Sequence, residues 1–302
     1  MINTLILGGA GMLGHKIFQQ LRERVPDTWC TVRGSAEEAV ALAPGLLDHQ
    51  NVIANVDAAD WPALEHLLGE IRPRLTVNCV GIVKQRAEAK SATPTITINA
   101  LLPHKLAELC RGWEGRLIHF STDCVFSGQR GHYSEQDESD AHDLYGRTKF
   151  LGEVNAPNAL TLRTSIIGRE LAHFQSLLEW FLDQDHSQVK GYTRALYSGV
   201  TTNYLAGLVA RIRSEFPRLS GLYQVTGDTI SKFELLCLLR EAFHMDVEIV
   251  PDHGFLCDRS LTGARFQTVT GYHWPAWAEL AAELAADPTP YPEWRKNVRQ
   301  TI

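Results

Sequence analysis

The sequence has no long uninterrupted apolar run. None of its hydrophobic stretches approaches the roughly 20 residues that a transmembrane helix needs, which argues against a membrane protein. The start, Met1 to Leu7, is a short apolar segment that stops at glycines, without the basic lead and the length of a signal peptide. We therefore expect a cytoplasmic protein that has no membrane partner.

Closely spaced cysteines are also missing. No two cysteines form a Cys-x-x-Cys pair, which argues against a zinc site and against a disulfide framework. We expect no bound metal, and we expect most of these side chains to be small buried residues. The six cysteines stand at positions 30, 79, 110, 124, 237 and 257.

The chain lacks an excess of basic residues, internal repeats and extended low-complexity segments. Its formal net charge is −6, so a broad nucleic-acid face is not expected, and any phosphate must be bound by local groups. The 302 residues are 44% hydrophobic and 21% charged, which is ordinary for a globular protein with one large core or two unequal domains.

Glycines join the first expected strand, residues 4–7, to a helix whose apolar residues recur at helical spacing up to Leu21. Glycine permits a sharp turn and a close approach of the backbone to a pyrophosphate, and a helix N-terminus offers free N–H groups to phosphates. The loop therefore predicts a dinucleotide site, with a tight turn that binds no ligand as the alternative. Its expected cofactor-binding residues are Gly8, Gly11, Met12, Leu13 and Gly14.

Arg33 follows the second expected strand. An NAD site usually has an acidic side chain here for the ribose 2′-hydroxyl, whereas a guanidinium suits a 2′-phosphate, so NADP(H) is favoured over NAD(H). The alternative is a solvated arginine. Asp57, after the third expected strand, would accept a hydrogen bond from the adenine, or would cap the helix expected over Trp61–Ile71 together with Asp60.

A further strand and turn is expected over residues 75–81. Its end, Val80 and Gly81, would pass beneath the pyrophosphate and the nicotinamide ribose. Lys84 and Gln85 follow in a position to reach a substrate, with a solvated loop as the alternative.

Adjacent hydroxyls, Ser121 and Thr122, end a buried strand that begins at Arg116. Open parallel sheets bind ligands at the carboxyl ends of their strands. A hydroxyl there can hydrogen-bond a substrate carbonyl or alkoxide, which makes Thr122 a candidate. Asp123 follows, and its alternative role is to accept backbone N–H groups.

Tyr145 and Lys149 lie four residues apart in a segment that is typical of a helix, so both side chains share one face. The phenol can give or take a proton, and the ammonium one turn away is expected to lower its pKa toward the working pH. A helix expected over residues 94–110 carries Asn99, which is either a surface residue or holds a water or a backbone kink beside the lysine.

Strand and helix patterns alternate along the first half of the chain. They predict an α/β fold, a Rossmann-type doubly wound parallel sheet. Residues 1–165 are expected to form the NAD(P)-binding domain, to which some later segments return. Residues 166–302 would mainly form a smaller C-terminal lobe over the carboxyl edge of the sheet, with the substrate in the cleft between them.

The glycine loop, the hydroxyl strand and the Tyr-x-x-x-Lys pair together resemble the extended short-chain dehydrogenase/reductase superfamily. Over nearly the whole chain, least so after about residue 245, the sequence is most similar to the dTDP-4-dehydrorhamnose reductase family. Segments 78–85 and 190–193 look typical of reductases of nucleotide-linked 6-deoxy sugars in surface-polysaccharide pathways. The matching family segments are 121–128, 133–135, 144–149, 162–165 and 199–202.

This resemblance implies hydride transfer from NADPH to C4 of a 4-keto-6-deoxy nucleotide sugar. Tyr145 would be the general acid, Lys149 would lower its pKa and bind the nicotinamide ribose, and Thr122 would hydrogen-bond the keto oxygen. The partner would be the nucleotide-sugar substrate, and because many relatives are dimers a homodimer is expected.

Cys124 departs from the family pattern, which usually has an aromatic residue at this position of the sugar pocket. The identity of the sugar therefore stays open. Related dehydratases carry Thr-Asp-Glu, and a cysteine does not replace that glutamate, so dehydration is disfavoured. Arg259 is a candidate for the diphosphate, with a surface arginine as the alternative. The expected substrate residues are Lys84, Asp123, Cys124 and Arg259.

Two rival functions share these motifs. One is a nucleotide-sugar epimerase that keeps its cofactor bound and returns the hydride. The other is a non-catalytic NADP-binding subunit that regulates a partner enzyme. The presence of Thr122, Tyr145 and Lys149 argues against a loss of activity.

Overall fold

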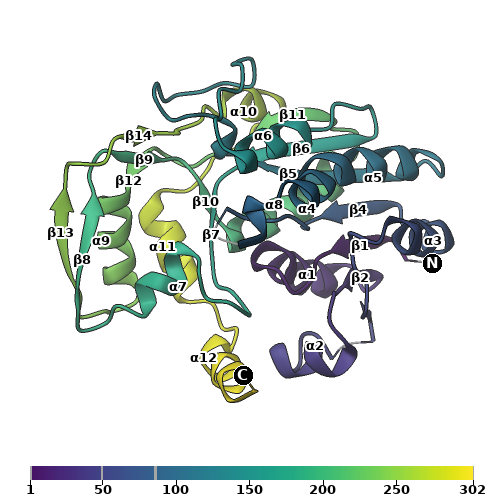
Figure 1. Ribbon diagram of the computed structural model, residues 1–302, viewed down its shortest axis with the longest axis horizontal. Helices are drawn as coiled ribbons and strands as arrows, with labels where there is room; N and C mark the ends of the chain where they lie inside the picture. The colour runs from purple at the N-terminus through teal and green to yellow at the C-terminus, as the bar shows by residue number, and fades with distance from the viewer. Residues whose placement is uncertain (1, 49, 85–86, 302) are drawn as a thin grey trace.

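The computed structural model describes residues 2–48, 50–84 and 87–301. Its centre is a seven-stranded parallel sheet, which confirms the predicted Rossmann-type fold (Figure 1). The strand order reverses direction at β1, as in a doubly wound sheet. Across the sheet the strands are β11 (Gly221–Gln224), β6 (Ala159–Thr164), β5 (Arg116–Thr122), β4 (Leu75–Asn78), β1 (Thr4–Leu7), β2 (Thr28–Thr31) and β3 (Val52–Ile53).

Helices cover both faces of the sheet because alternate strand residues point to opposite sides. Ile6 belongs to the apolar core on one side, whereas Leu5 and Leu7 belong to the core on the other. The first face carries α1 (Met12–Arg24), α2 (Ala36–Leu42) and α8 (Thr202–Glu215), and the second carries α3 (Trp61–Ile71), α5 (Leu102–Arg111) and α6 (Leu144–Leu151).

The helix expected over residues 94–110 is divided into α4 (Ala92–Thr95), the π-helical turn η2 (Ile96–Leu101) and α5. Asn99 lies in the π turn and is fully buried, so it is not a surface residue. A 3₁₀ turn, η1 (Ala87–Lys90), precedes α4.

The second half of the chain builds a lobe with its own apolar core, at the left in Figure 1. The lobe contains β8 (Gln188–Tyr192) beside β13 (Glu248–Asp252), the sheet β12 (Ile230–Ser231), β9 (Ala195–Tyr197) and β14 (Cys257–Asp258), and helices α7 (Leu177–Leu182), α9 (Lys232–Ala242) and α11 (Trp277–Ala285). Two of its strands, β8 and β9, are separated by a turn of the chain at Thr193 and Arg194.

Later segments also return to the large sheet. β11 pairs with β6 at its edge, and α8 packs against α1. β7 (Ile166–Ile167) and β10 (Val200–Thr201) form a short parallel pair where the chain passes between the two cores, and α10 (Ala264–Thr270) packs beside β11.

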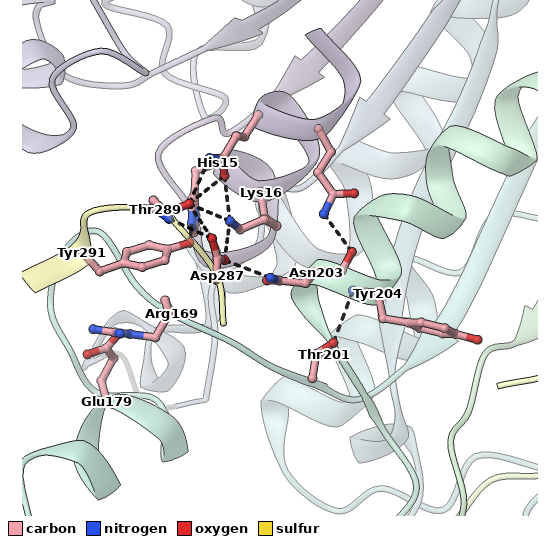
Figure 2. Close-up of polar contacts among 12 residues, drawn as sticks. His15, Lys16, Arg169, Glu179, Thr201, Asn203, Tyr204, Asp287, Thr289 and Tyr291 are labelled. Carbon is pink, nitrogen blue, oxygen red and sulfur yellow. Dashed lines mark hydrogen bonds and ion pairs between the residues drawn. The ribbon is translucent and has the colours of Figure 1, made fainter. Parts of the chain in front are cut away.

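A buried polar cluster fastens the end of the chain to α1 (Figure 2). Lys16 and Asp287 form an ion pair of 2.6 Å, and the Asn203 amide donates to the same carboxylate at 2.9 Å. His15 Nδ1 donates to the Gly11 carbonyl, so Nε2 accepts from the Tyr291 hydroxyl at 2.8 Å. These contacts hold the start of α12 (Tyr291–Thr301) against the first turn of α1. Among the described residues, no helix is both long enough and apolar enough to cross a bilayer.

Candidate functional site

The glycine loop lies at the carboxyl end of β1, in the middle of the sheet. Gly8 has a φ of +85°, which favours glycine, and Gly11 precedes α1 as its N-cap. A Cβ on Gly14 would clash with the Gly8 carbonyl oxygen, so only glycine lets α1 start this close to the strand. The structure therefore brings Gly8, Gly11, Met12, Leu13 and Gly14 together at one turn, as the sequence predicted.

Arg33 follows β2, the neighbour of β1, and Asp57 follows β3, the next strand outward. Arg33 is exposed, and the backbone beyond it is hydrogen-bonded to residues 53–56, so both side chains belong to the same edge as the glycine loop. Asp57 accepts a hydrogen bond from the Ala59 N–H at 2.9 Å, while Asp60 caps α3. Contact of Arg33 with a 2′-phosphate and of Asp57 with adenine stay predictions.

The turn after β4 packs directly against the glycine loop. A Cβ on Gly8 would lie 3.1 Å from Val80 Cγ2, and Gly81 continues the turn at the surface. The buried Asn99 fixes this turn from η2, because its amide accepts from the Ile82 N–H at 2.8 Å and donates to the Ile82 carbonyl at 2.9 Å. Val80 and Gly81 thus lie between the glycine loop and the residues at the end of β5.

Thr122 ends β5 and begins the 3₁₀ turn η3 (Asp123–Val125). Its hydroxyl donates to the Asp123 carboxylate at 3.0 Å and accepts from the Cys124 N–H at 3.1 Å. Asp123 is only 7% exposed, and its carboxylate accepts this hydrogen bond, while its contact with a substrate stays a prediction.

Tyr145 lies in the first turn of α6, which Asp143 caps by accepting from the Gly146 N–H at 2.7 Å. A Cβ on Gly146 would clash with the Cys124 carbonyl oxygen, so this glycine lets α6 lie directly on η3. This packing brings the phenol near the Thr122 hydroxyl, which acts on its pKa.

The expected lowering of the pKa of Tyr145 by Lys149 is wrong for this structure. Burial raises the pKa of the phenol well above its usual value, and the hydrogen bond with Thr122 only partly opposes this. The Lys149 ammonium instead donates to the Phe120 carbonyl at 2.7 Å. Burial lowers the pKa of Lys149 to about 8, with Glu153 acting in the opposite direction.

The predicted substrate residues gather at the same end of the sheet. Lys84 forms an ion pair of 2.7 Å with Asp143, the cap of α6, and both side chains are partly exposed. Burial raises the pKa of the Cys124 thiol to about 12. Arg259 Nε donates to the Phe126 carbonyl at 2.8 Å, so this guanidinium holds the backbone after η3. Gln85 lies outside the described residues.

Sequence reasoning missed Lys232, the first residue of α9. Its ammonium lies 3.8 Å from the centre of the Tyr197 ring, and the charge of Asp123 acts on it. The sequence carries one indication of its role. A lysine at the first position of a helix is unfavourable because its charge opposes the helix dipole, so another reason for the residue can be sought there. In the described part of the chain, no group of three or more His, Cys, Asp or Glu side chains is arranged to hold a metal ion.

Comparisons with known proteins agree with this geometry. The sequence profile described as the RmlD substrate binding domain matches residues 2–302. The chain is 32% identical over 172 residues to the probable low-salt glycan biosynthesis reductase Agl14 of Haloferax volcanii, covering 54% of this chain but only about half, 53%, of that relative. It is 23% identical over 260 residues to methionine adenosyltransferase 2 subunit beta of Xenopus laevis, covering 80% of this chain and 72% of that one.

A solved structure shows the same fold. The dTDP-4-dehydrorhamnose reductase of Bacillus anthracis, described in complex with NADP, superposes with a TM-score of 0.76 at 18% identity, covering 95% of this chain and 100% of that chain. The resemblance predicted from the three motifs is confirmed, because the profile spans nearly every residue and the sheet, glycine loop and Tyr-x-x-x-Lys helix stand where that fold requires them. The chain belongs to the RmlD substrate binding domain family and has the extended short-chain dehydrogenase/reductase fold.

Proposed function

We propose that this protein is an NADPH-dependent reductase of a 4-keto-6-deoxy nucleotide sugar that serves polysaccharide or glycan synthesis. The observation that supports this most directly is the meeting of Thr122, Tyr145 and Lys149 at the carboxyl end of β5, beside the glycine loop of β1. A hydroxyl, a phenol and an ammonium at that edge suit the reduction of a carbonyl group.

The residues fit a dinucleotide. Gly14 lets α1 start directly at the glycine loop, and the first N–H groups of α1 would receive the pyrophosphate. Arg33 would bind the 2′-phosphate, Asp57 the adenine, and Lys149 the nicotinamide ribose. When bound, the cofactor supplies the hydride.

Tyr145 is the proton donor in this proposal. The carbonyl carbon gains a hydride and the carbonyl oxygen becomes an alkoxide, which takes the phenolic proton to give the alcohol. The raised pKa of Tyr145 keeps that proton on the phenol at neutral pH, which suits an acid. Thr122 lies next to the phenol and would hydrogen-bond the same substrate oxygen, so two groups orient the carbonyl.

The test is loss of NADPH absorbance with a panel of nucleotide-linked 4-keto-6-deoxy sugars, made in place by a dehydratase and carrying dTDP, UDP or GDP. Steady oxidation with one sugar supports the reductase and identifies the substrate. NADPH binding without oxidation of any panel member would contradict it.

The second candidate is a regulatory subunit that binds NADP. The similarity to methionine adenosyltransferase 2 subunit beta, over 80% of this chain, favours it. Conversion of a nucleotide sugar without net loss of NADPH would instead indicate an epimerase. Product analysis of the same reactions distinguishes these outcomes.

A further inference from the structure

Three strands of the second lobe bring a lysine to the site. β12 pairs with β9, and β9 pairs with β14, so Ser231 at the end of β12 lies beside Leu196, which is flanked on its other side by Asp258. Lys232 follows β12 directly as the first residue of α9. Its ammonium lies 3.8 Å from the centre of the Tyr197 ring, a distance at which the ring face attracts a cation.

These strands also tie the start of α9 to the segment that follows Thr122, because the Asp258 N–H of β14 donates to the Gly128 carbonyl at 2.7 Å. Burial lowers the pKa of Lys232 to about 8, while Asp123, Cys124 and Cys257 act in the opposite direction. Asp123 is hydrogen-bonded to Thr122, so the second lobe places a positive charge whose field acts on the side of the site that holds these two residues.

The position is unfavourable for a lysine in the absence of a ligand. A cation at a helix N-terminus opposes the helix dipole, and burial of an ammonium has a further cost. Within the described part of the chain no oxygen accepts a hydrogen bond from the Lys232 ammonium, whose contact there is the Tyr197 ring.

The other cations near the site have acceptors. Lys149 donates to the Phe120 carbonyl, Arg259 to the Phe126 carbonyl, and Lys84 to the Asp143 carboxylate. Lys232 is therefore a cation whose N–H donors no described oxygen engages, so they are available for a bound molecule.

We propose that Lys232 is a substrate-binding residue whose ammonium donates to an oxygen of the nucleotide sugar close to the reacting carbon, either on the diphosphate or on the sugar. This inference rests on the proposed function for the identity of the substrate. It also accounts for the charge balance, because the charge of Lys232 offsets that of the buried Asp123 carboxylate, which would otherwise repel a diphosphate.

The test compares Lys232→Met, which removes the charge and keeps the length of the side chain, with Lys232→Arg, which keeps the charge. Lys105→Met is the matched control, because the Lys105 ammonium also lies over an aromatic ring, 4.8 Å from the Trp61 centroid, but on α5 at the far side of the large sheet (Figure 1). For each variant, the KM for the nucleotide sugar, kcat, the Kd for NADPH and the midpoint of thermal unfolding are measured.

We expect Lys232→Met to raise the KM for the nucleotide sugar at least tenfold, with the Kd for NADPH within twofold of the wild type. Lys232→Arg should recover most of the affinity, and Lys105→Met should resemble the wild type. A purely structural role beside Asp123 would lower kcat and thermal stability and leave the KM unchanged. An unchanged KM in Lys232→Met overturns the proposal.

A binding arm distinguishes the two sources of the oxygen and does not depend on turnover. Titration of dTDP and UDP into the NADP⁺-bound protein should show weaker binding to Lys232→Met if the contact is to the diphosphate. Equal binding of these nucleotides together with a raised KM for the sugar nucleotide assigns the contact to the sugar. If the wild type reduces no sugar, the proposed function fails. The proposal for Lys232 is then supported only if Lys232→Met weakens nucleotide binding. It is overturned if nucleotide binding is unchanged in the variant or absent in the wild type.

Discussion

Lys16 and Asp287 form an ion pair of 2.6 Å with side chains only 3% and 4% exposed, although 271 positions of the sequence separate them. Burial lowers the pKa of the Lys16 ammonium. The pKa of Asp287 is lowered as well, because its hydrogen bonds with Lys16, Thr289 and Asn203 favour the carboxylate more than burial disfavours it. The pair ties α1, which begins at the glycine loop, to the segment before α12 (Figure 2).

Asp287→Asn should destabilise the protein strongly. It leaves a buried ammonium without its counter-charge, which typically costs about 3–5 kcal/mol. Glu215→Gln is the control, because it breaks the exposed ion pair with Arg211, and such a pair contributes little to stability. The free energy of unfolding in urea measures both, and equal losses would show that the Lys16–Asp287 pair is not a stabilising contact.

His15 should make the protein sensitive to acid. Burial lowers the pKa of His15 to about 4 from its ordinary 6.5. The unfolded chain then binds the proton more readily, so stability is complete above pH 6.5 and is lost as the pH falls toward 4. This single group should remove about 2 kcal/mol between pH 7 and pH 5.

The measurement is urea unfolding at both pH values for the wild type and for His15→Gln, which does not titrate. The difference between the two pH values should shrink in the variant, whatever its stability at pH 7. An unchanged pH difference would mean that His15 is not buried as a neutral ring.

Gly14→Ala should impair cofactor binding. The added methyl group meets the Gly8 carbonyl and pushes α1 away from β1. We expect the Kd for NADPH to rise at least tenfold in a fluorescence titration. Gly69→Ala in α3, where a methyl group meets no described atom within 4 Å, should bind NADPH normally and be as stable as the wild type or more so.

Tyr145→Phe should lower kcat at least about 100-fold, because the substrate oxygen loses its proton donor. The Kd for NADPH should stay within about twofold, since the ring and the helix are retained. Turnover at the wild-type rate would exclude the phenol as the acid.

Local patterns in the sequence were sufficient for much of the fold. Helix α3 spans the predicted Trp61–Ile71, and the glycine loop stands between a strand and a helix as expected, because caps, periodicity and glycine geometry act over a few residues. Helices α2, α10 and α12 were not predicted. Two of them span only seven residues, and α12 is placed by contacts with distant parts of the chain.

The site was less predictable where it depends on distant contacts. Nothing near Lys16 in the sequence indicates that Asp287 neutralises it, and nothing near Lys232 indicates Tyr197 and Asp123 as neighbours. The raised pKa of Tyr145 follows from burial that only the folded chain creates. Residue types at fixed spacing predicted the chemistry, but the charges around them are set by the packing of two lobes.

The Lys16–Asp287 pair has a consequence for synthesis on the ribosome. Chains emerge from the N-terminus, so α1 and its glycine loop appear long before Asp287 and Tyr291 are made. Until then the Lys16 ammonium lacks the Asp287 carboxylate that neutralises it in the interior, so α1 does not complete its packing against its neighbours. The nucleotide-binding half of a nascent chain therefore reaches its final packing only after the second lobe has been translated, and a chain that stops before residue 287 should be recognised by proteases as unfinished.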